Sequence, residues 1–456
     1  MTRTVLRRAT PFVGLLLATL LVSLGGSAGA AQQLTFKPYH ANGIYQAGER
    51  VGWDVVVAEG SAAVPGVYSY VVKRDGEAVM AQGTFAMTSG SAKIETSLKQ
   101  PGMVLVEVRA PAGVAGFHGA SKSEVGRVLL GAAVVPLQIK PSYTRPADFD
   151  VFWSSKLEAL AAIPMDPVVK PGDSEKPGVE WYTVRMNNIK GGHVYGQLAR
   201  PAGEGQHPAL LILQWASPPY PLQKSWVTER AAEGWLVLNV EPHDVPPDMP
   251  QSFYDNLPAI LKQYNTIGQH SRDDSWFLQM YLGDYRAAEY LASRPDWDGK
   301  TLAVMGTSMG GQQSFAAAGL NPRITAMLVN VPSGADVLGP LHGRAAPYPN
   351  WDVKQPDVRQ TAMYFDDVNF APRIKAQALI GLGFIDETST PAGIWAAYNL
   401  IQGPKEAVPM MDSPHNHMAT TEEQAPIVKR TAEWLNLLVK GETPTVATTG
   451  GVPAGR

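Results

Sequence analysis

The sequence predicts an α/β fold with a doubly wound, mostly parallel sheet, preceded by a small all-β sandwich domain. Three observations support this prediction. From residue 141 to residue 440, short apolar runs alternate with segments of helical periodicity, as in βαβ units. Residues 34–140 instead contain alternating or β-branched runs separated by Gly, Pro and Asn. A proline-marked passage, VVPLQIKPSYTRP, separates these two kinds of sequence.

Residues 1–30 have the features of a signal peptide. Arginines precede the apolar run PFVGLLLATLLVSLGG, and a small-residue stretch with an A-x-A pattern ends at Ala30. A membrane anchor is the alternative, but the run is short for a spanning helix and small residues follow it. Cleavage near Ala30 predicts a bacterial periplasmic or secreted protein with no membrane attachment, and the absence of cysteine suits such a protein.

The composition limits the function further. Hydrophobic residues make up 45% of the 456-residue chain and charged residues 17%, which are globular values. A net charge of −3 gives no electrostatic reason to expect nucleic acid or an anionic membrane as a partner. Without cysteine, a thiol nucleophile and a thiolate metal site are excluded.

Residues 34–140 predict an immunoglobulin-like sandwich. The expected strands are RVGWDVVVAEG, VYSYVVKRDG, AKIETSLK and MVLVEVRA, and their spacing is that of a small antiparallel sandwich. No catalytic spacing is found there, so we expect the chemistry elsewhere.

Residues 141–440 predict the doubly wound domain. It begins with the helical segment ADFDVFWSSKLEALAAIP and an expected hairpin, EWYTVRMNNIKGGHVYGQLARP. The buried parallel strands are expected at ALLILQW, WLVLNV, TLAVMG, AMLVNV and ALIGLGFID. Ligands of such sheets bind beyond the carboxyl ends of the strands, so the site is expected at that edge. Residues 441–456 are expected to form a disordered tail.

Ser308 is the candidate nucleophile. Gly306, Ser308 and Gly310 form a G-x-S-x-G pattern that follows the apolar run LAVM and precedes the helical segment GGQQSFAAAGL. In a strand–turn–helix context this pattern exposes a serine hydroxyl at the edge of a sheet. The pattern also occurs by chance, so a base and an acid have to be found elsewhere in the chain.

An acid and a base follow Ser308 in the chain order of an α/β-hydrolase, which is serine, acid, histidine. Asp386 ends the apolar run ALIGLGFID, with Glu387 as a substitute, and a helix-capping role is the alternative for Asp386. His415 and His417 both lie in the later segment MMDSPHNHMATTEE. Local pattern does not choose between these two histidines as the base that takes the Ser308 proton.

The oxyanion of an acyl-transfer reaction needs hydrogen-bond donors. The backbone N–H of Met309 is one, and a second is expected after LLILQW, near Trp215 or Ala216. Trp215 is a candidate pocket residue, and packing beside the sheet is its alternative. The sequence HNH and the nearby Asp412 lack a further ligand cluster, so no metal site is expected.

These residues resemble the acetyl xylan esterase and cephalosporin-C deacetylase group, carbohydrate esterase family seven of the α/β-hydrolases, over residues 141–440. The blocks that carry the resemblance are RPADFDVFWSSKLEAL, the segment YLGDYRAAEYLASRPDWDGKTLAVMGTSMGGQQS with Asp284 and Arg286, GLGFIDETSTPAGIWAAYN and SPHNHM. The resemblance implies that Asp386 is the acid. It favours His417 over His415 as the base, because the family has Gly-His-Glu there, and His415 is then a candidate pocket residue.

The sequence departs from the family in the expected pocket wall. Met309 stands where the family usually has glutamine, and VEPHDVPPD, with Glu241, His243 and Asp244, replaces Arg-Gly-Gln-Gly. Gln-Trp-Ala at residues 214–216 replaces His-Gly-Tyr. The resemblance also implies a homo-oligomer, whose ring-like arrangement an added N-terminal domain could obstruct.

Together these features predict an exported serine carboxylesterase that uses no metal or organic cofactor and removes acetyl groups from sugars or oligosaccharides. A serine peptidase or amidase on the same fold is an alternative, because triad geometry serves both ester and amide cleavage. A carbohydrate-binding protein whose hydrolase half is inactive is the other alternative, and an intact set of catalytic residues opposes it.

Overall fold

The structure is a computed structural model, and it describes residues 34–61, 66–88, 90–111, 117, 126–215, 220–415 and 422–447. The expected signal peptide and residues 448–456 of the expected tail lie outside these ranges. Within them, none of the helices combines the length and the apolar character needed to span a bilayer.

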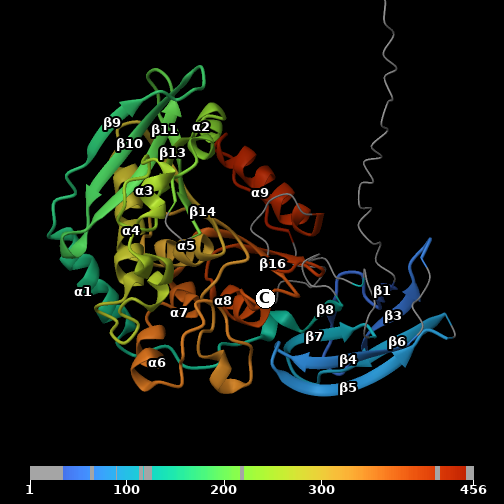
Figure 1. Cartoon of the computed structure of the whole chain (residues 1–456). Coiled ribbons are helices and arrows are strands. Elements are labelled where there is room, and N and C mark those ends of the chain that lie inside the picture. The colour runs from blue at the N-terminus through green and yellow to red at the C-terminus, as the bar shows by residue number, and fades with distance from the viewer. Residues whose placement is uncertain are drawn as a thin grey trace, which may run out of the picture.

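Strands β1 to β8 form two sheets, which we call the N-terminal sheets (Figure 1). The first has the order β1-β3-β6 and the second β2-β8-β7-β4-β5. They share one apolar core, with Trp53 and Ile94 from the first sheet and Val72 and Val106 from the second. The predicted strands and sandwich are therefore present, while the immunoglobulin-like assignment stays a prediction. The bounds are β1 Leu34–Pro38, β2 Ile44–Tyr45, β3 Val51–Val57, β4 Val67–Arg74, β5 Ala78–Ala86, β6 Ser91–Thr96, β7 Gly102–Arg109 and β8 Arg127–Val134.

The other strands form one sheet in the order β17-β16-β15-β14-β12-β13-β11-β10-β9. Neighbours from β13 to β17 pair in parallel, whereas β9, β10 and β11 pair antiparallel, as the expected hairpin requires. The chain reverses its direction of winding between β12 and β14, and such switch points are where α/β sheets bind ligands. The bounds are β9 Val168–Gly172, β10 Val179–Asn187, β11 His193–Pro201, β12 His207–Leu213, β13 Leu236–Val240, β14 Trp297–Thr307, β15 Ala326–Asn330, β16 Gln377–Gly383 and β17 Lys405–Met410.

Helices cover both faces of this sheet (Figure 1). Alternate residues of β12 point to opposite faces, so Leu211 packs in the core with α4, α5 and α8, and Leu210 in the core with α2 and α9. The doubly wound prediction is confirmed. The α-helices are α1 Phe149–Ala161, α2 Lys224–Ala232, α3 Gln251–Asp255, α4 Trp276–Ser293, α5 Met309–Leu320, α6 Pro356–Ala362, α7 Asp367–Phe370, α8 Pro391–Leu400 and α9 Ala425–Leu438. The 3₁₀ helices are η1 Pro136–Gln138, η2 Ile189–Gly191, η3 Ala259–Thr266, η4 Gly339–His342, η5 Ala371–Arg373 and η6 Glu422–Gln424.

Residues 441–447 of the expected tail are described by the structure, and two of them make hydrogen bonds with the nine-stranded sheet. The carbonyl oxygen of Pro444 accepts a hydrogen bond from Gln377 Nε2 at 2.7 Å. The backbone N–H of Ala447 donates to Glu406 Oε2 at 2.8 Å. These backbone groups find partners on β16 and β17, which composition alone does not reveal.

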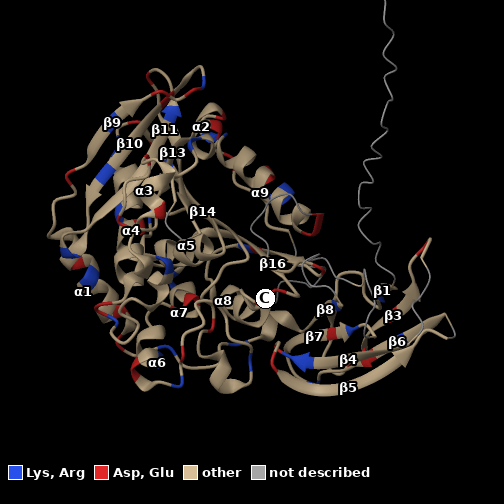
Figure 2. Cartoon of the chain, viewed as in Figure 1, with Lys and Arg blue, Asp and Glu red and all other residues tan. Residues whose placement is uncertain are grey.

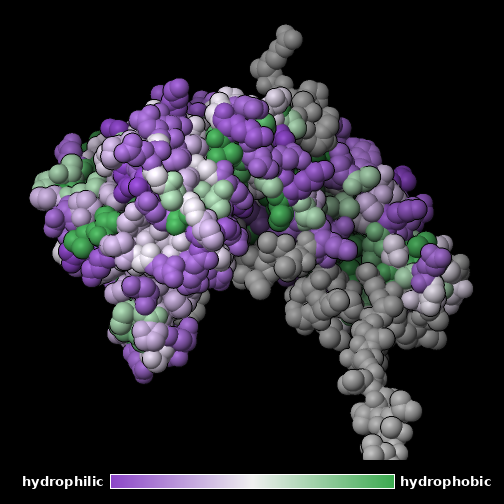
Figure 3. Space-filling view, turned by 90° about the horizontal axis from the view of Figure 1, so that it is seen from above, coloured by the Kyte–Doolittle hydropathy of each residue, from purple (hydrophilic) through white to green (hydrophobic). Residues whose placement is uncertain are grey.

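The surface shows how charge and hydropathy are distributed. Acidic and basic side chains are interspersed over the described part of the chain (Figure 2). The face seen in Figure 3 is mainly hydrophilic, with hydrophobic residues in small groups.

Candidate active site

Ser308 lies in a tight turn between β14 and α5, at the carboxyl end of the strand. Its φ of 57° and ψ of −119° form a conformation that a non-glycine residue adopts only when its surroundings enforce it. A Cβ on Gly306 would lie 2.3 Å from the backbone of Gly310, and one on Gly310 would lie 2.1 Å from the carbonyl oxygen of Leu213. Both glycines of the pattern are therefore needed for the turn to close.

Ser308, His415 and Asp386 form a hydrogen-bonded chain. Ser308 Oγ is 2.9 Å from His415 Nε2, and His415 Nδ1 is 2.8 Å from Asp386 Oδ2. If Nδ1 carries the imidazole proton, it donates to the carboxylate and leaves the Nε2 lone pair free to accept from the serine hydroxyl. The arrangement can therefore remove a proton from Ser308 as its oxygen attacks an electrophile.

The histidine in this chain is His415, whereas the sequence analysis favoured His417. The preference for His417 is therefore not matched by the geometry: His415, the candidate pocket residue, lies between Ser308 and Asp386 where the base is expected. The turn after β17 is short and pressed against the end of β16, where a Cβ on Gly383 would lie 2.2 Å from the carbonyl oxygen of Ser413. Two residues beyond Ser413, His415 reaches Ser308. His417 lies outside the described residues.

Asp386 is buried and held on both carboxylate oxygens. Oδ1 accepts hydrogen bonds from the backbone N–H groups of Thr388 and Ser389 at 2.8 and 2.7 Å, which leaves Oδ2 for the imidazole. The expected position of the acid after β16 is therefore correct, and its chemical role stays a prediction. Glu387, the substitute considered from the sequence, instead pairs with Arg127 at 2.6 Å.

Two buried serines that the sequence analysis missed extend the site. Ser333 Oγ lies 3.3 Å from Ser308 Oγ and 2.9 Å from Ser389 Oγ. Ser333 follows β15 and Ser389 belongs to the loop after β16, so both come from carboxyl ends of parallel strands. A search for hydroxyl residues just after each predicted strand would have found them.

The candidate oxyanion donors are placed only in part. Met309 is the first residue of α5, so its N–H is among those at a helix N-terminus without an intrahelical acceptor. The side chain of Met309 is buried in an apolar cluster that includes Phe365. At the position where the sequence departs from the family, the side chain therefore packs in the core. The second donor, Ala216, lies outside the described residues.

Trp215 packs against neighbouring aromatic rings. Its centroid is 5.2 Å from that of Trp226 and 6.2 Å from that of Tyr220. The carbonyl oxygen of Trp215 accepts a hydrogen bond from the Tyr220 hydroxyl at 2.9 Å. The packing interpretation is thus observed, and the pocket role stays a prediction.

The segment that replaces the family's Arg-Gly-Gln-Gly carries buried ionisable groups beyond β13. Burial raises the pKa of the Glu241 carboxyl well above its ordinary value and lowers the pKa of His243 to about 3. The ring of His243 lies 4.9 Å from that of Tyr264. Both groups are therefore favoured in their neutral forms. In the described part of the chain, no group of three or more His, Cys, Asp or Glu side chains could hold a metal ion.

Asp284 and Arg286 of α4 are both buried, and Arg286 contacts α1. Arg286 donates hydrogen bonds to the carbonyl oxygens of Leu160 and Ile163, at and after the end of α1, at 2.8 and 3.0 Å. Burial raises the pKa of Asp284 well above its ordinary value. Arg286 therefore joins α1 to α4.

The fold and its matches to known proteins define the class of the protein, a carboxylic ester hydrolase of the α/β-hydrolase type. The family model for acetyl xylan esterase (AXE1) matches residues 137–337 and 348–432. The chain therefore belongs to the acetyl xylan esterase family, and the resemblance stated from the sequence is confirmed.

One relative extends beyond this region. The acetyl esterase Axe7A of Xylanibacter ruminicola is 29% identical over 426 residues, which cover 90% of this chain and 94% of the relative. An alignment of that length has to include much of the chain before residue 137. The N-terminal part therefore has a counterpart in that protein.

Solved structures of acetyl xylan esterases are matched by about two thirds of this chain. The enzyme from Paenibacillus sp. R4 has a TM-score of 0.55 and 26% identity, covering 65% of this chain and 98% of its own. Acetyl xylan esterase 1 from Thermoanaerobacterium sp. JW/SL YS485 has a TM-score of 0.56 and 21% identity, covering 66% of this chain and 96% of its own. The second likeness concerns the fold alone.

Proposed function

We propose that this esterase removes acetyl groups from sugars or oligosaccharides, with Ser308 as nucleophile, His415 as base and Asp386 as the acid that orients the imidazole. The observation that carries the proposal is the chain from Ser308 Oγ through His415 to Asp386, at 2.9 and 2.8 Å. The names of the family and of the matched relatives support acetate as the acyl group.

In the first half of the reaction, His415 Nε2 takes the proton of Ser308 as Oγ attacks the acetyl carbonyl carbon. The carbonyl oxygen becomes negatively charged and accepts a hydrogen bond from the backbone N–H of Met309. The C–O bond to the sugar then breaks, and His415 returns the proton to the leaving sugar oxygen. Asp386 stabilises the transient imidazolium without taking its proton.

In the second half, His415 activates a water molecule, which attacks the acetyl-enzyme carbonyl. His415 takes one proton of this water and passes it to Ser308 Oγ as the bond to Oγ breaks, and the acetic acid that leaves ionises to acetate in solution. Because all these steps use groups of the chain, the proposal requires no metal or organic cofactor.

Hydrolysis of a panel of acetylated sugars and longer acyl esters tests this proposal. We expect the wild type to prefer acetyl esters and Ser308→Ala to lose on the order of 10⁵–10⁶ in kcat. Equal activity of the two proteins would exclude Ser308 as nucleophile. A preference for longer acyl chains would reject the deacetylase proposal while leaving the esterase class intact, and a matching amide panel would reveal a peptidase.

A further inference from the structure

The loop that carries Asp386 lies directly on the N-terminal sheets. We call residues 384–389 the acid loop. A Cβ on Gly131 of β8 would lie 2.5 Å from Phe384 Cβ, so the two backbones approach closely. Ile385 forms a small buried cluster with Leu105 of β7 and Leu129 of β8. The residues on either side of Asp386 thus contact another part of the molecule.

An ion pair completes this contact. Arg127 Nη2 of β8 lies 2.6 Å from Glu387 Oε1, with side chains that are 17% and 45% exposed. The same guanidinium lies 3.5 Å from Glu107 of β7, which also contacts Arg109. Arg127 is therefore the point where a charge network of the N-terminal sheets reaches the residue next to Asp386.

The contacts between β8 and the acid loop all lie on one face of the strand. Arg127, Leu129 and Gly131 are alternate residues, so they share a face. They meet Glu387, Ile385 and Phe384 in turn, and the loop therefore runs opposite to the strand. The intervening residues of β8, Val128, Leu130 and Ala132, lie in the core of the sandwich.

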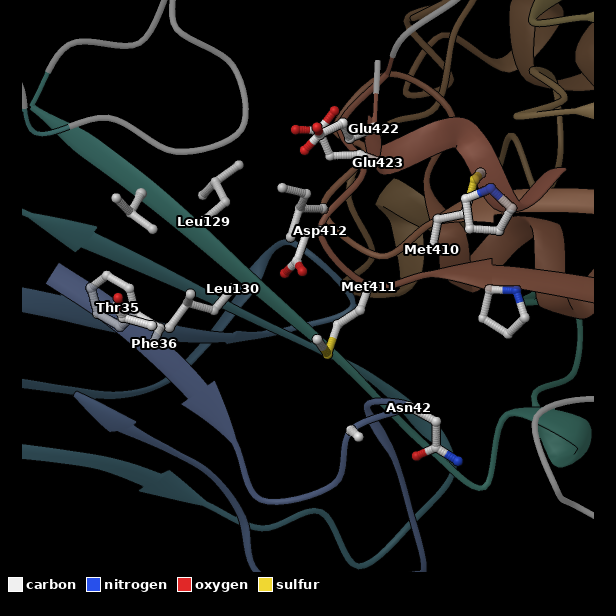
Figure 4. Close-up of a pocket in the computed structure, with 15 residues that line it drawn as sticks. Thr35, Phe36, Asn42, Leu129, Leu130, Met410, Met411, Asp412, Glu422 and Glu423 are labelled. Carbon is white, nitrogen blue, oxygen red and sulfur yellow. The ribbon is translucent and has the colours of Figure 1, made fainter. Parts of the chain in front are cut away.

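This contact explains an unusual feature of β8, which is buried along nearly its whole length. A strand of an antiparallel sandwich normally has one face in the core and one in water. In β8 the second face is covered by the acid loop. Two cavities flank the junction, one of about 670 Å³ lined by Leu129 and Ile385 and one of about 200 Å³ lined by Leu105 and Asp386. Figure 4 shows Met411 and Asp412 of the loop after β17 extending towards β8 across the larger cavity.

A second contact holds the far end of the acid loop. The backbone N–H of Ala345 donates to the carbonyl oxygen of Asp75, in the turn between β4 and β5, at 2.9 Å. Three residues later, the backbone N–H of Tyr348 donates to the carbonyl oxygen of Thr388 at 2.8 Å. The N-terminal sheets therefore reach the acid loop both directly through β8 and through residues 345–348.

We infer that the N-terminal sheets position the catalytic acid, and that Arg127 is a positioning residue that acts on Asp386 through Glu387. This inference rests on the proposed function, because it assigns Asp386 a part in the reaction. It gives the N-terminal sheets a role in catalysis rather than in carbohydrate binding.

The test compares Arg127→Ala, Glu387→Gln and the double variant with the wild type. Arg109→Ala is the matched control, because Arg109 contacts Glu107 in the same network but its side chain is 61% exposed. Two rates are measured: kcat/KM for 4-nitrophenyl acetate between pH 5 and 9, and the rate at which diisopropyl fluorophosphate modifies Ser308. The second rate reports on the nucleophile whatever the natural ester is.

We expect each single variant to lower both rates on the order of tenfold through kcat, with KM nearly unchanged, since misplaced catalytic groups slow the chemical step. The double variant should be no slower than the slower single variant, because both changes break the same contact. Arg109→Ala should keep wild-type rates, and Arg127→Lys should recover part of the loss.

Arg127→Ala and Glu387→Gln also distinguish a positioning role from an effect of the removed charge on the electric field at the site. They remove charges of opposite sign, so an effect through the electric field would move the pH–rate profiles in opposite directions. Positioning lowers both rates. Opposite shifts, or wild-type rates in both variants, would overturn the inference and leave the proposed function standing.

Other outcomes are equally decisive. A wild type that is modified at Ser308 but does not cleave acetyl esters rejects the proposed substrate, while the reagent still tests Arg127. A wild type that is not modified at all rejects both proposals. If Arg127→Ala does not fold, Glu387→Gln tests the inference alone, because it changes only the partly exposed carboxylate of Glu387. Thermal unfolding shows whether this variant is folded.

Discussion

The loop after β12 is fixed from within the nine-stranded domain, whereas the acid loop on the other side of Ser308 rests on the N-terminal sheets. Gln313 Nε2 of α5 donates to the carbonyl oxygen of Gln214 at 2.7 Å, and Gln214 Nε2 donates to Asn239 Oδ1 at 3.0 Å. The direct contacts of the acid loop with the N-terminal sheets are mainly apolar, with Leu105 and Leu129, and include one ion pair. The two sides of one site are therefore supported by different physical means.

This difference has consequences for mutation. A buried amide network tolerates little, because removing one partner leaves another polar group unsatisfied. An apolar contact between two parts of a chain loses free energy in proportion to the surface exposed and can weaken without misfolding. Substitutions on the two sides of the site are therefore expected to have different effects on stability and rate.

The largest effect on activity is expected at His415, the proposed base, which contacts both Ser308 and Asp386. His415→Ala should lower kcat/KM by about 10⁴–10⁶, because Ser308 loses its proton acceptor. His417→Ala is the control and should stay within a few-fold of the wild type. Ester hydrolysis by the two variants measures this, and the reverse order of activities would restore His417 as the base.

Leu129→Ala tests the apolar support of the acid loop. We expect the free energy of unfolding to fall by about 2–4 kcal/mol, as for other Leu→Ala changes at buried sites, and kcat to fall as well. Leu130→Ala is the matched control, since this neighbour faces the sandwich core. It should cost similar stability and leave kcat unchanged. Denaturant unfolding and initial rates are the measurements, and equal kcat losses in both variants would contradict a specific support by β8.

Gln313→Leu tests the internal support. The carbonyl oxygen of Gln214 loses its donor, so the free energy of unfolding should fall by about 1–3 kcal/mol. The rate should fall too, because the neighbouring oxyanion donors shift. Gln312→Leu on the same helix is the control, since Gln312 Nε2 donates instead to the carbonyl oxygen of Phe365. Denaturant unfolding and kcat for 4-nitrophenyl acetate measure both effects. A wild-type kcat in Gln313→Leu would show that the loop after β12 does not depend on this bond.

The effect that is smallest at neutral pH is a change in pH dependence at His243. Burial lowers the pKa of His243 from 6.5 to about 3, so in this pH range the unfolded chain takes up a proton that the folded site does not. His243 therefore stabilises the folded state above pH 6.5, and this contribution is lost at about 1.4 kcal/mol per pH unit as the pH falls towards 3. Glu241 acts in the opposite sense, because its raised pKa favours folding at low pH.

The buried carboxyl groups are the same in His243→Phe and in the wild type. The difference between the two proteins in the pH dependence of the free energy of unfolding therefore reports on His243 alone. Urea unfolding at several pH values should show that the variant loses less stability than the wild type as the pH falls from 6.5 to 3. Parallel curves for the two proteins would mean that His243 is protonated in the folded state.

Much of the fold followed from local sequence. The runs that became β12 to β16 are short, apolar and followed by turn residues, and the G-x-S-x-G pattern was tied to a turn that only glycines allow. Chain order was enough to place Asp386 after its strand. These features depend on neighbours in sequence, so one chain contains the information.

What could not be predicted depends on contacts between distant segments. RVLLGAAV, which forms β8, lacks the alternation of a half-exposed strand because the acid loop covers its outer face. The choice between His415 and His417 depended on how tightly the turn after β17 packs on Gly383. Ser333 and Ser389 were missed because they meet only when neighbouring parallel strands end together.

The coverage of β8 by the acid loop also sets an order of events during synthesis. A ribosome releases the N-terminal sheets first, and the residues that cover Leu105 and Leu129 emerge only after most of the second domain has been made. Until then, a nascent chain exposes an apolar strand face that could pair with other molecules. Completion of the catalytic loop is thus also the event that shields this face from aggregation.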